Sequence, residues 1–278
     1  MTAAAASKKH LVIFTDLDGT LLDSGTYAWE AARPALDRLR EKKIPLVLCS
    51  SKTRSEIKAI RKAINNCDPF ISENGGGIFV PEDYFPFSWT FDRRIEGYKV
   101  IEPGTPYARL REILQTIARD TGLGLKEYGD LSVGEVAAQA GLSLDQARRA
   151  KQRDYDEPFV LAGSPDQRQR VLEMIVKQGL RWTKGSRYYH LTGANDKGRA
   201  VRIATGLFVK KFGKVKTVAL GDSPNDLPML AVVNYPILVQ RPDGRYDETM
   251  RLPHLLHADG IGPIGWNSAV LKLLEDYK

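Results

Sequence analysis

Two short acidic patterns in this sequence have the residue types and the spacing to do chemistry. Asp16 and Asp18 stand two residues apart in DLDGT, directly after an apolar run, and Asp222 and Asp226 stand in GDSPND. Carboxylates that are brought together repel one another, so some must be protonated or a cation must neutralise them. Because no His or Cys cluster accompanies these acids, their hard oxygen ligands favour Mg²⁺.

Carboxylates beside such a cation can do two different jobs on a phosphate ester. One can attack phosphorus and form an aspartyl-phosphate, and another two residues along can protonate the leaving oxygen and then activate water. A hydroxyl at a strand end and a lysine at a helix start can bind phosphoryl oxygens. Ser50 and Ser51 are the candidate hydroxyls, Ser50 being favoured because it directly follows an apolar run, and Lys197 is the candidate lysine.

The elements around these residues must bring them to one place. Apolar runs at Leu11 to Thr15, at 44–50 and at VKTVALGD are typical of strands buried on both faces. Helical spacing follows the second run, at Ser55 to Asn65, and precedes the third, at Lys197 to Lys211. This alternation predicts a parallel α/β sheet, whose function sits at the carboxyl ends of its strands.

The pattern changes at about residue 83 and returns after Gly193. The intervening segment is aromatic and proline-punctuated at first, and then mixes helical and strand-like stretches. The returning part ends with PILVQ, which we predict to be the last strand. We therefore predict a doubly wound parallel-sheet core made of residues 1–83 and 192–278, interrupted by an α+β cap made of residues 84–191.

The composition is that of a soluble globular protein. Of 278 residues, 42% are hydrophobic and 27% charged, and the formal net charge of +7 is scattered along the chain. Scattered basic residues suit a small anionic substrate better than nucleic acid. The two cysteines form neither a disulfide framework nor a metal-ligand set, and no signal peptide or membrane span is evident. We expect a cytoplasmic protein.

The motifs together resemble a known family. DLDGT, the strand-end Ser50, Lys197 in NDKG and GDSPND resemble, in order, the four motifs of the haloacid dehalogenase (HAD) superfamily of phosphotransferases. The resemblance implies a Rossmann-like core, with Asp16 as the nucleophile and Asp18 as the general acid and base. Ser50 and Lys197 would hold the transferring phosphoryl group. Many relatives have Thr-Gly-Arg where this chain has Ser50, Ser51 and Lys52, so Ser51 stays an alternative.

The same resemblance implies a metal site. Mg²⁺ would be bound by the carboxylates of Asp16 and Asp222 and by the backbone carbonyl of Asp18. Asn225 and Asp226 would support these ligands.

The insertion follows SENGGGIF, a position that resembles the Cof-like sugar-phosphatase subgroup with a large α/β cap. Within it, RDYDEPF and RYYHLTGANDKG resemble the mannosyl-3-phosphoglycerate phosphatases. This implies a phosphomonoesterase that acts on mannosyl- or glucosyl-3-phosphoglycerate. A phosphomutase of the same fold, or a phosphatase of sucrose, trehalose or hexose phosphates, is the alternative.

Four further residues are candidates for substrate contact. Asn74 lies in the glycine-rich turn, and Arg153 and Glu157 lie in RDYDEPF. A phosphoglyceryl glycoside needs a cation for its carboxylate and an acceptor for its hydroxyls, but Arg153 and Glu157 could instead pair on the surface. His190 is a candidate too, although a histidine in a strand is more often structural.

One stretch favours a different class of protein. DLSVGEVAAQAGLSLDQARRAK, at 130–151, imitates a DNA-reading helix-turn-helix with Arg148 and Arg149 on its second helix. Because the stretch lies inside the predicted cap, a DNA-binding regulator is the remote alternative. We expect no nucleic-acid or membrane partner, and the oligomeric state is unknown from the sequence.

Overall fold

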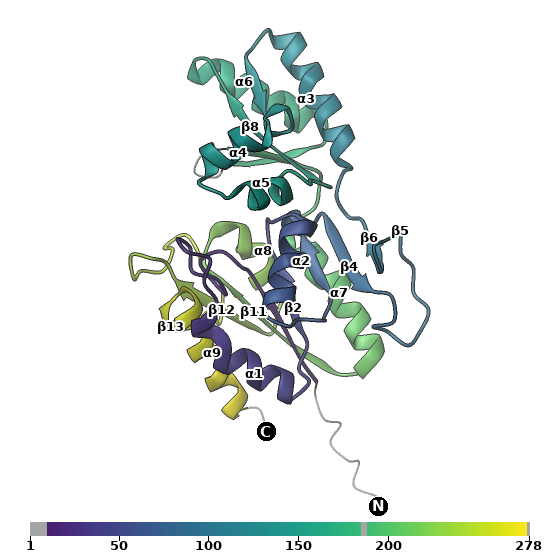
Figure 1. Cartoon of the computed structure of the whole chain (residues 1–278), viewed down its shortest axis with the longest axis vertical. Helices are drawn as coiled ribbons and strands as arrows, with labels where there is room; N and C mark the ends of the chain where they lie inside the picture. Colours follow the sequence, from purple (N-terminus) through teal and green to yellow (C-terminus); the bar gives the residue numbers. More distant parts are fainter. Residues whose placement is uncertain (1–9, 185–187, 277–278) are drawn as a thin grey trace, which may run out of the picture.

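The chain forms two lobes, the smaller inserted into the larger. The computed structural model describes residues 10–184 and 188–276, so the first nine residues, where we predicted no signal peptide, lie outside it. Figure 1 shows the smaller lobe above the larger one, which holds both the first and the last described residues. The larger lobe is built on a nine-stranded sheet and the smaller on a four-stranded sheet.

The nine-stranded sheet has a parallel part and an antiparallel edge. Its order is β13 (Leu256–Ile261), β12 (Tyr235–Gln240), β11 (Val215–Gly221), β1 (His10–Thr15), β2 (Leu46–Cys49), β3 (Phe70–Ser72), β4 (Gly77–Pro81), β6 (Tyr98–Ile101) and β5 (Arg93–Ile95). The pairs from β13 to β3 are parallel, and those from β3 to β5 are antiparallel. This confirms the predicted α/β class.

Helices cover both faces of this sheet. One face holds η1 (Glu30–Ala32), α1 (Arg33–Glu41), α2 (Arg54–Ala63) and α9 (Gly262–Asp276); the other holds α7 (Lys197–Phe212) and α8 (Leu227–Leu230). In β1, Ile13 packs on the first side and Phe14 on the second, because alternate strand residues face opposite ways. The predicted burial of β1 on both faces is confirmed.

The smaller lobe, which we call the cap, is a two-layer α+β unit. Its elements are α3 (Tyr107–Thr121), β7 (Leu125–Glu127), η3 (Tyr128–Asp130), α4 (Val133–Ala140), α5 (Leu144–Ala150), β8 (Asp156–Leu161), α6 (Pro165–Lys177), β9 (Arg181–Lys184) and β10 (Tyr189–Thr192). The sheet order is β7-β8-β10-β9, antiparallel throughout. Helices α3 and α6 pack on one face of it through residues such as Phe159 and Leu191.

Two predicted boundaries are wrong. Strands β5 and β6 belong to the nine-stranded sheet, so residues 93–101 lie in the larger lobe and not in the predicted cap 84–191. PILVQ is not the last strand, since β13 and α9 follow it. The three strands missed, β5, β6 and β13, are at or next to a sheet edge, and their half-exposed residues give no apolar run. None of the described helices is long and apolar enough to cross a membrane.

Candidate active site

The backbone that carries Asp16 is held on both sides. The Asp16 amide donates a 2.9 Å hydrogen bond to the carbonyl of Leu220 in the neighbouring β11. The Thr15 hydroxyl donates to the Asp16 carbonyl (2.8 Å) and accepts from the indole N–H of Trp266 (2.9 Å). Asp16 therefore leaves the end of β1 in a fixed direction, and it is 5% exposed.

Lys197 joins two of the predicted acids. Asp196 caps α7 by accepting from the Arg199 amide, which places Lys197 in the first turn. The Lys197 Nζ lies 2.6 Å from Asp16 Oδ1 and 2.6 Å from Asp226 Oδ1. Burial lowers the pKa of this lysine, but the two carboxylates more than reverse the effect and raise it. Lys197 is therefore a buried cation between two acids.

The turn after β11 supplies Asp222 and Asp226. The Asp226 Oδ2 accepts from the amides of Asp222 (3.1 Å) and Ser223 (3.2 Å), so Asp226 holds the turn as well as the lysine. The Asp222 Oδ1 accepts from the Thr20 hydroxyl at 3.1 Å. Burial, and then the charge of Asp226, raises the pKa of Asp222 to about 6.

These residues form a site that fits a hard cation. Oxygen atoms from Asp16, Asp222 and Asp226 all lie within 4.8 Å of one another. Burial, and then Asp226, raises the pKa of Asp16 well above its ordinary value, although Lys197 opposes this. One ammonium cannot balance three carboxylates, and the donors are all oxygens, which suits a divalent ion such as Mg²⁺. Asp226, which we predicted as a supporting residue, is the third carboxylate of the cluster; the predicted Asp18 ligand is a backbone carbonyl and not a side chain.

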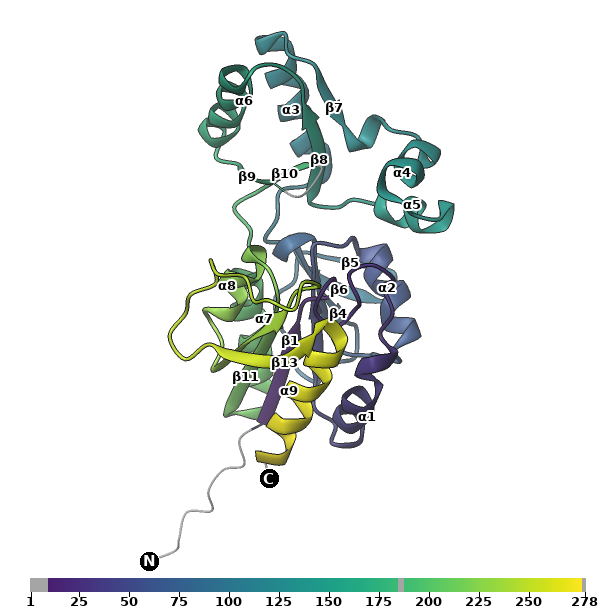
Figure 2. The same ribbon diagram turned by 90° about the vertical axis from the view of Figure 1, so that its left-hand side faces the viewer.

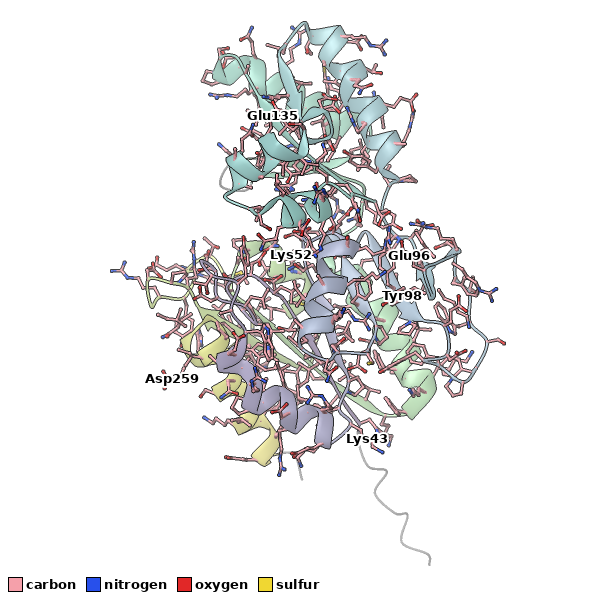
Figure 3. The ribbon with its side chains drawn as sticks, viewed as in Figure 1. Lys43, Lys52, Glu96, Tyr98, Glu135 and Asp259 are labelled. Atoms are coloured by element: carbon pink, nitrogen blue, oxygen red, sulfur yellow. The ribbon has the colours of Figure 1, made fainter. Side chains whose placement is uncertain are left out.

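The Asp18 side chain is not part of this cluster and pairs instead with Lys52. The Asp18 Oδ2 lies 2.9 Å from the Lys52 Nζ, and that ammonium lies 4.6 Å from the centre of the Tyr27 ring. The other carboxylate oxygen, Oδ1, is buried without a hydrogen-bond partner among the described residues. Figure 3 shows Lys52 at the junction of the two lobes. We assigned Lys52 no role from the sequence, where its only signal was its place after the two serines.

Gly19 allows the backbone that follows Asp18 to pass close to the side chain of Asp222. Its φ is +76°, and a Cβ at this position would lie 2.8 Å from the Asp222 Oδ2. A larger residue would therefore be strained in its backbone and would also push Asp222 aside.

The structure also brings Ser50 close to Asn74. Ser50 is 1% exposed, its hydroxyl accepts from the Lys52 amide (3.2 Å), and its carbonyl accepts from the Asn74 amide (3.0 Å). Asn74 has a left-handed backbone, and its side-chain carbonyl accepts from Asn225 at 3.3 Å. Ser51 is less buried than Ser50, and its backbone carbonyl faces Arg153. Asn74 and Asn225 therefore meet beside the turn that holds Asp222 and Asp226.

The predicted substrate residues of the cap separate into two groups. Arg153 contacts the Asp156 carboxylate (3.5 Å) and the Ser51 carbonyl (3.4 Å), and His190 contacts the same carboxylate. Glu157 instead accepts from the Gly129 amide (2.9 Å), and burial raises its pKa to about 7. Like Phe159, it lies on the face of β8 that the cap helices cover, so the surface pair of Arg153 with Glu157 is absent.

The cap is anchored to the larger lobe through Glu73, which sequence reasoning missed. Its buried carboxylate accepts from the amides of Asp154 (3.0 Å) and Tyr155 in the cap. Burial is the main cause that raises the pKa of Glu73, to about 8. Arg54 pairs with the Asp154 carboxylate at 3.1 Å. A lone glutamate in a glycine-rich turn carried no signal of this contact.

The helix-turn-helix-like segment lies against the larger lobe. The Thr53 hydroxyl, at the start of α2, donates to the carbonyl of Arg149 in α5 at 2.9 Å. A groove of about 280 Å³ remains beside this contact, lined by residues of both lobes that include Tyr27 and Trp29. Helix α5 thus serves as part of the contact between the lobes.

The site has an aspartate at the end of β1 and a lysine that bridges two acids, and a cap is inserted into the doubly wound core. This is the arrangement expected of a two-lobed phosphohydrolase. The comparisons with known proteins agree. A family model described as haloacid dehalogenase-like hydrolase matches residues 13–95. A phosphatase of the haloalkanoate superfamily from Bacteroides thetaiotaomicron, 18% identical, has a TM-score of 0.66 with 99% of this chain and 98% of its own covered.

Two curated relatives are much more similar in sequence. One, from Methanococcoides burtonii, is 50% identical over 96% of this chain and 97% of its own length; the other, from Persephonella marina, is 40% identical over 96% and 98%. Both are named glucosyl-3-phosphoglycerate/mannosyl-3-phosphoglycerate phosphatase. The chain belongs to the haloacid dehalogenase-like hydrolases. It is an enzyme of the phosphoric monoester hydrolase class.

Proposed function

We propose that this enzyme is a Mg²⁺-dependent phosphatase of mannosyl-3-phosphoglycerate or glucosyl-3-phosphoglycerate. Its products would be the glycosylglycerate and inorganic phosphate. The cluster of Asp16, Asp222 and Asp226 around Lys197 carries the chemical part of the proposal. The names of relatives that match nearly the whole chain support the substrate.

The residues present suit two in-line steps. In the first, an Asp16 carboxylate oxygen attacks phosphorus, the bond from phosphorus to the glycerate oxygen breaks, and Asp18 gives that oxygen a proton. In the second, Asp18 takes a proton from water, the water oxygen attacks the phosphorus of the aspartyl-phosphate, and the Asp16 carboxylate leaves. Lys197 and Ser50 would bind the phosphoryl oxygens throughout.

A bound Mg²⁺ would supply positive charge that offsets the carboxylates and the phosphoryl group. Asp16, Asp222 and the Asp18 carbonyl would hold it, with Asp226 and Asn225 in support. Asp226 is suited to support because both of its oxygens already have partners, Lys197 on one and turn amides on the other. Removal of Mg²⁺ by a chelator should stop turnover, and added Mg²⁺ should restore it.

The contacts of α5 disfavour the alternative of a DNA-binding regulator. This helix has seven residues, its Ala147 and Ala150 are buried, and Arg148 pairs with Asp145 of the same helix. A recognition helix must present its side chains to the major groove. Helix α5 is instead packed against α2 of the larger lobe.

The direct test is phosphate release from a panel of phosphate esters, with Asp16→Asn beside the wild type. The panel holds both glycosyl-3-phosphoglycerates, sucrose and trehalose phosphates, and hexose 1- and 6-phosphates. We expect the glycosyl-3-phosphoglycerates to give the highest kcat/KM and Asp16→Asn to lower it at least about a thousandfold. Asp37→Asn, on the exposed face of α1, is the matched control.

Two results would contradict the proposal. Near wild-type turnover by a folded Asp16→Asn would remove the nucleophile assignment. A preference for a hexose phosphate, or interconversion of hexose 1- and 6-phosphates, would favour another phosphatase or a phosphomutase.

A further inference from the structure

Helices α3 and α6 cover one face of the cap sheet, and we call the opposite face the open face. Tyr189 and Leu191 of β10 pack with α3 and α6, so the alternate residues His190 and Thr192 lie on the other face. In the register of β8 with β10, Thr192 is opposite Asp156, which therefore shares this open face with His190. Figure 2 shows β9 and β10 between the larger lobe and the two helices α3 and α6.

The open face is turned toward the catalytic edge of the large sheet. Arg181 of β9 is opposite Thr192 and so lies on the same face. Its guanidinium reaches the carboxylate of Asp196 at 3.5 Å, and Asp196 directly precedes Lys197. The Asp156–His190 pair is therefore on the side of the cap from which a substrate bound at Asp16 would be contacted.

The pair itself has a defined orientation. The His190 Nδ1 lies 2.9 Å and 3.2 Å from the two Asp156 oxygens, and the Asp156 side chain is fully buried. Burial opposes ionisation of Asp156, but His190 and Arg153 outweigh it and lower its pKa. An ionised carboxylate only accepts hydrogen bonds, so Nδ1 must be the donor. The other ring nitrogen, Nε2, has no hydrogen-bond partner among the described residues.

Arg153, the cation that we predicted for the substrate carboxylate, is already in use. Its Nε donates to the Ala150 carbonyl (2.9 Å), its Nη1 to the Ser51 carbonyl (3.4 Å), and its side chain is 9% exposed. The His190 side chain is 24% exposed. Of the two candidates, His190 is the more exposed, and its Nε2 has no hydrogen-bond partner among the described residues.

We propose that His190 binds the carboxylate of the phosphoglycerate portion of the substrate through Nε2, and that Asp156 positions the ring. This inference rests on the proposed function, which supplies a substrate with both a phosphate and a carboxylate. A carboxylate ligand requires Nε2 to donate, so the complex holds the imidazolium, whose charge Asp156 balances. The guanidinium groups of Arg153 and Arg181 add to the positive potential of this face.

The test compares two substrates that differ in one group. One is whichever glycosyl-3-phosphoglycerate the wild type hydrolyses faster, and the other is the same compound with its carboxyl group converted to the amide. We expect His190→Gln to lower kcat/KM for the acid about 10- to 100-fold, mainly through KM, and to leave the amide nearly unchanged. Turnover of p-nitrophenyl phosphate, which has no carboxylate, should stay at the wild-type level.

Two variants test whether Asp156 acts by orienting His190 or whether any loss of charge or structure in the cap has the same effect. Asp156→Asn should raise KM for the acid while leaving kcat for p-nitrophenyl phosphate intact, and loss of both activities would show a merely structural role for Asp156. Lys126→Gln removes another positive charge from the open face, farther along the sheet opposite Val160, and should change neither substrate's kinetics.

The outcomes also distinguish this inference from the proposed function. A wild-type enzyme that hydrolyses p-nitrophenyl phosphate but neither glycosyl-3-phosphoglycerate would overturn the proposed function, and the inference would fall with it. An active wild type whose preference for acid over amide survives His190→Gln would overturn the inference alone.

Discussion

Replacement of Gly19 by alanine would test the proposed metal site with little change in chemical groups. The residue has a φ of +76°, and alanine in a left-handed conformation costs about 1–2 kcal/mol. The new Cβ would also stand 2.8 Å from the Asp222 Oδ2, too close for a carbon–oxygen contact. Because Thr20 fixes the other oxygen of Asp222, the carboxylate cannot turn away without losing that hydrogen bond.

Gly97 provides the matched control. It lies in the turn between β5 and β6 with a φ of +82°, and an added Cβ would meet nothing within 4 Å. Gly97→Ala therefore carries the same backbone cost of about 1–2 kcal/mol without a steric contact. Both variants should lose about this amount of unfolding free energy, but only Gly19→Ala should lose Mg²⁺ affinity and turnover, by about 10- to 100-fold.

The measurement has two parts. Denaturant unfolding followed by circular dichroism gives the stability of each variant, and phosphate release against Mg²⁺ concentration gives metal affinity and kcat. If Gly19→Ala needed no more Mg²⁺ than Gly97→Ala and turned over as fast, Asp222 would not be a metal ligand and the reasoning would be refuted.

Three further substitutions test the supports of the site. The pKa of Glu73 is raised from 4.5 to about 8 in the folded protein, so the stability that its protonation contributes is full below pH 4.5 and is lost as pH rises through 8. Wild-type unfolding free energy should thus fall by about 2–3 kcal/mol more than that of Glu73→Gln between pH 6 and 9, and parallel pH curves would contradict this. Trp266→Phe removes the hydrogen bond to Thr15 and should cost about 1–3 kcal/mol in denaturant unfolding, whereas an unchanged stability would show that water replaces the indole. Lys52→Gln removes the partner of Asp18 and should lower kcat for p-nitrophenyl phosphate about tenfold with little change in KM, with recovery in Lys52→Arg; a pure KM effect would argue for substrate binding instead.

The proximity of Asp16, Lys197, Asp222 and Asp226 could be predicted from the sequence for a physical reason. Strands buried on both faces read as apolar runs, and parallel neighbours end at the same edge, so acids that follow such runs must meet. Asp196, which caps the N-terminus of α7, likewise fixes the position of Lys197. The edge elements β5, β6 and β13 could not be found this way, because their half-exposed residues do not form apolar runs.

The substrate side of the site was less predictable because it depends on strand register. Asp156 and Glu157 are adjacent acids in one strand, and a shift of one residue would exchange the faces on which they lie. We chose Glu157 and left Asp156 out, whereas the structure places Asp156 on the open face with His190 and buries Glu157 under the cap helices. Residue types alone do not determine which of the two acids lies on the open face.

The loop after β2 connects the chemical and the substrate side of the enzyme. Residues 51–54 follow the candidate phosphate ligand Ser50, and three of them contact the cap. These contacts are Ser51 with Arg153, Thr53 with Arg149, and Arg54 with Asp154. The remaining residue of this loop, Lys52, pairs with Asp18. Opening of the cap would therefore disturb both the loop after β2 and the proposed proton donor. We therefore expect cap closure and assembly of the proposed catalytic groups to be coupled, which would let a substrate that fits the cap favour its own turnover.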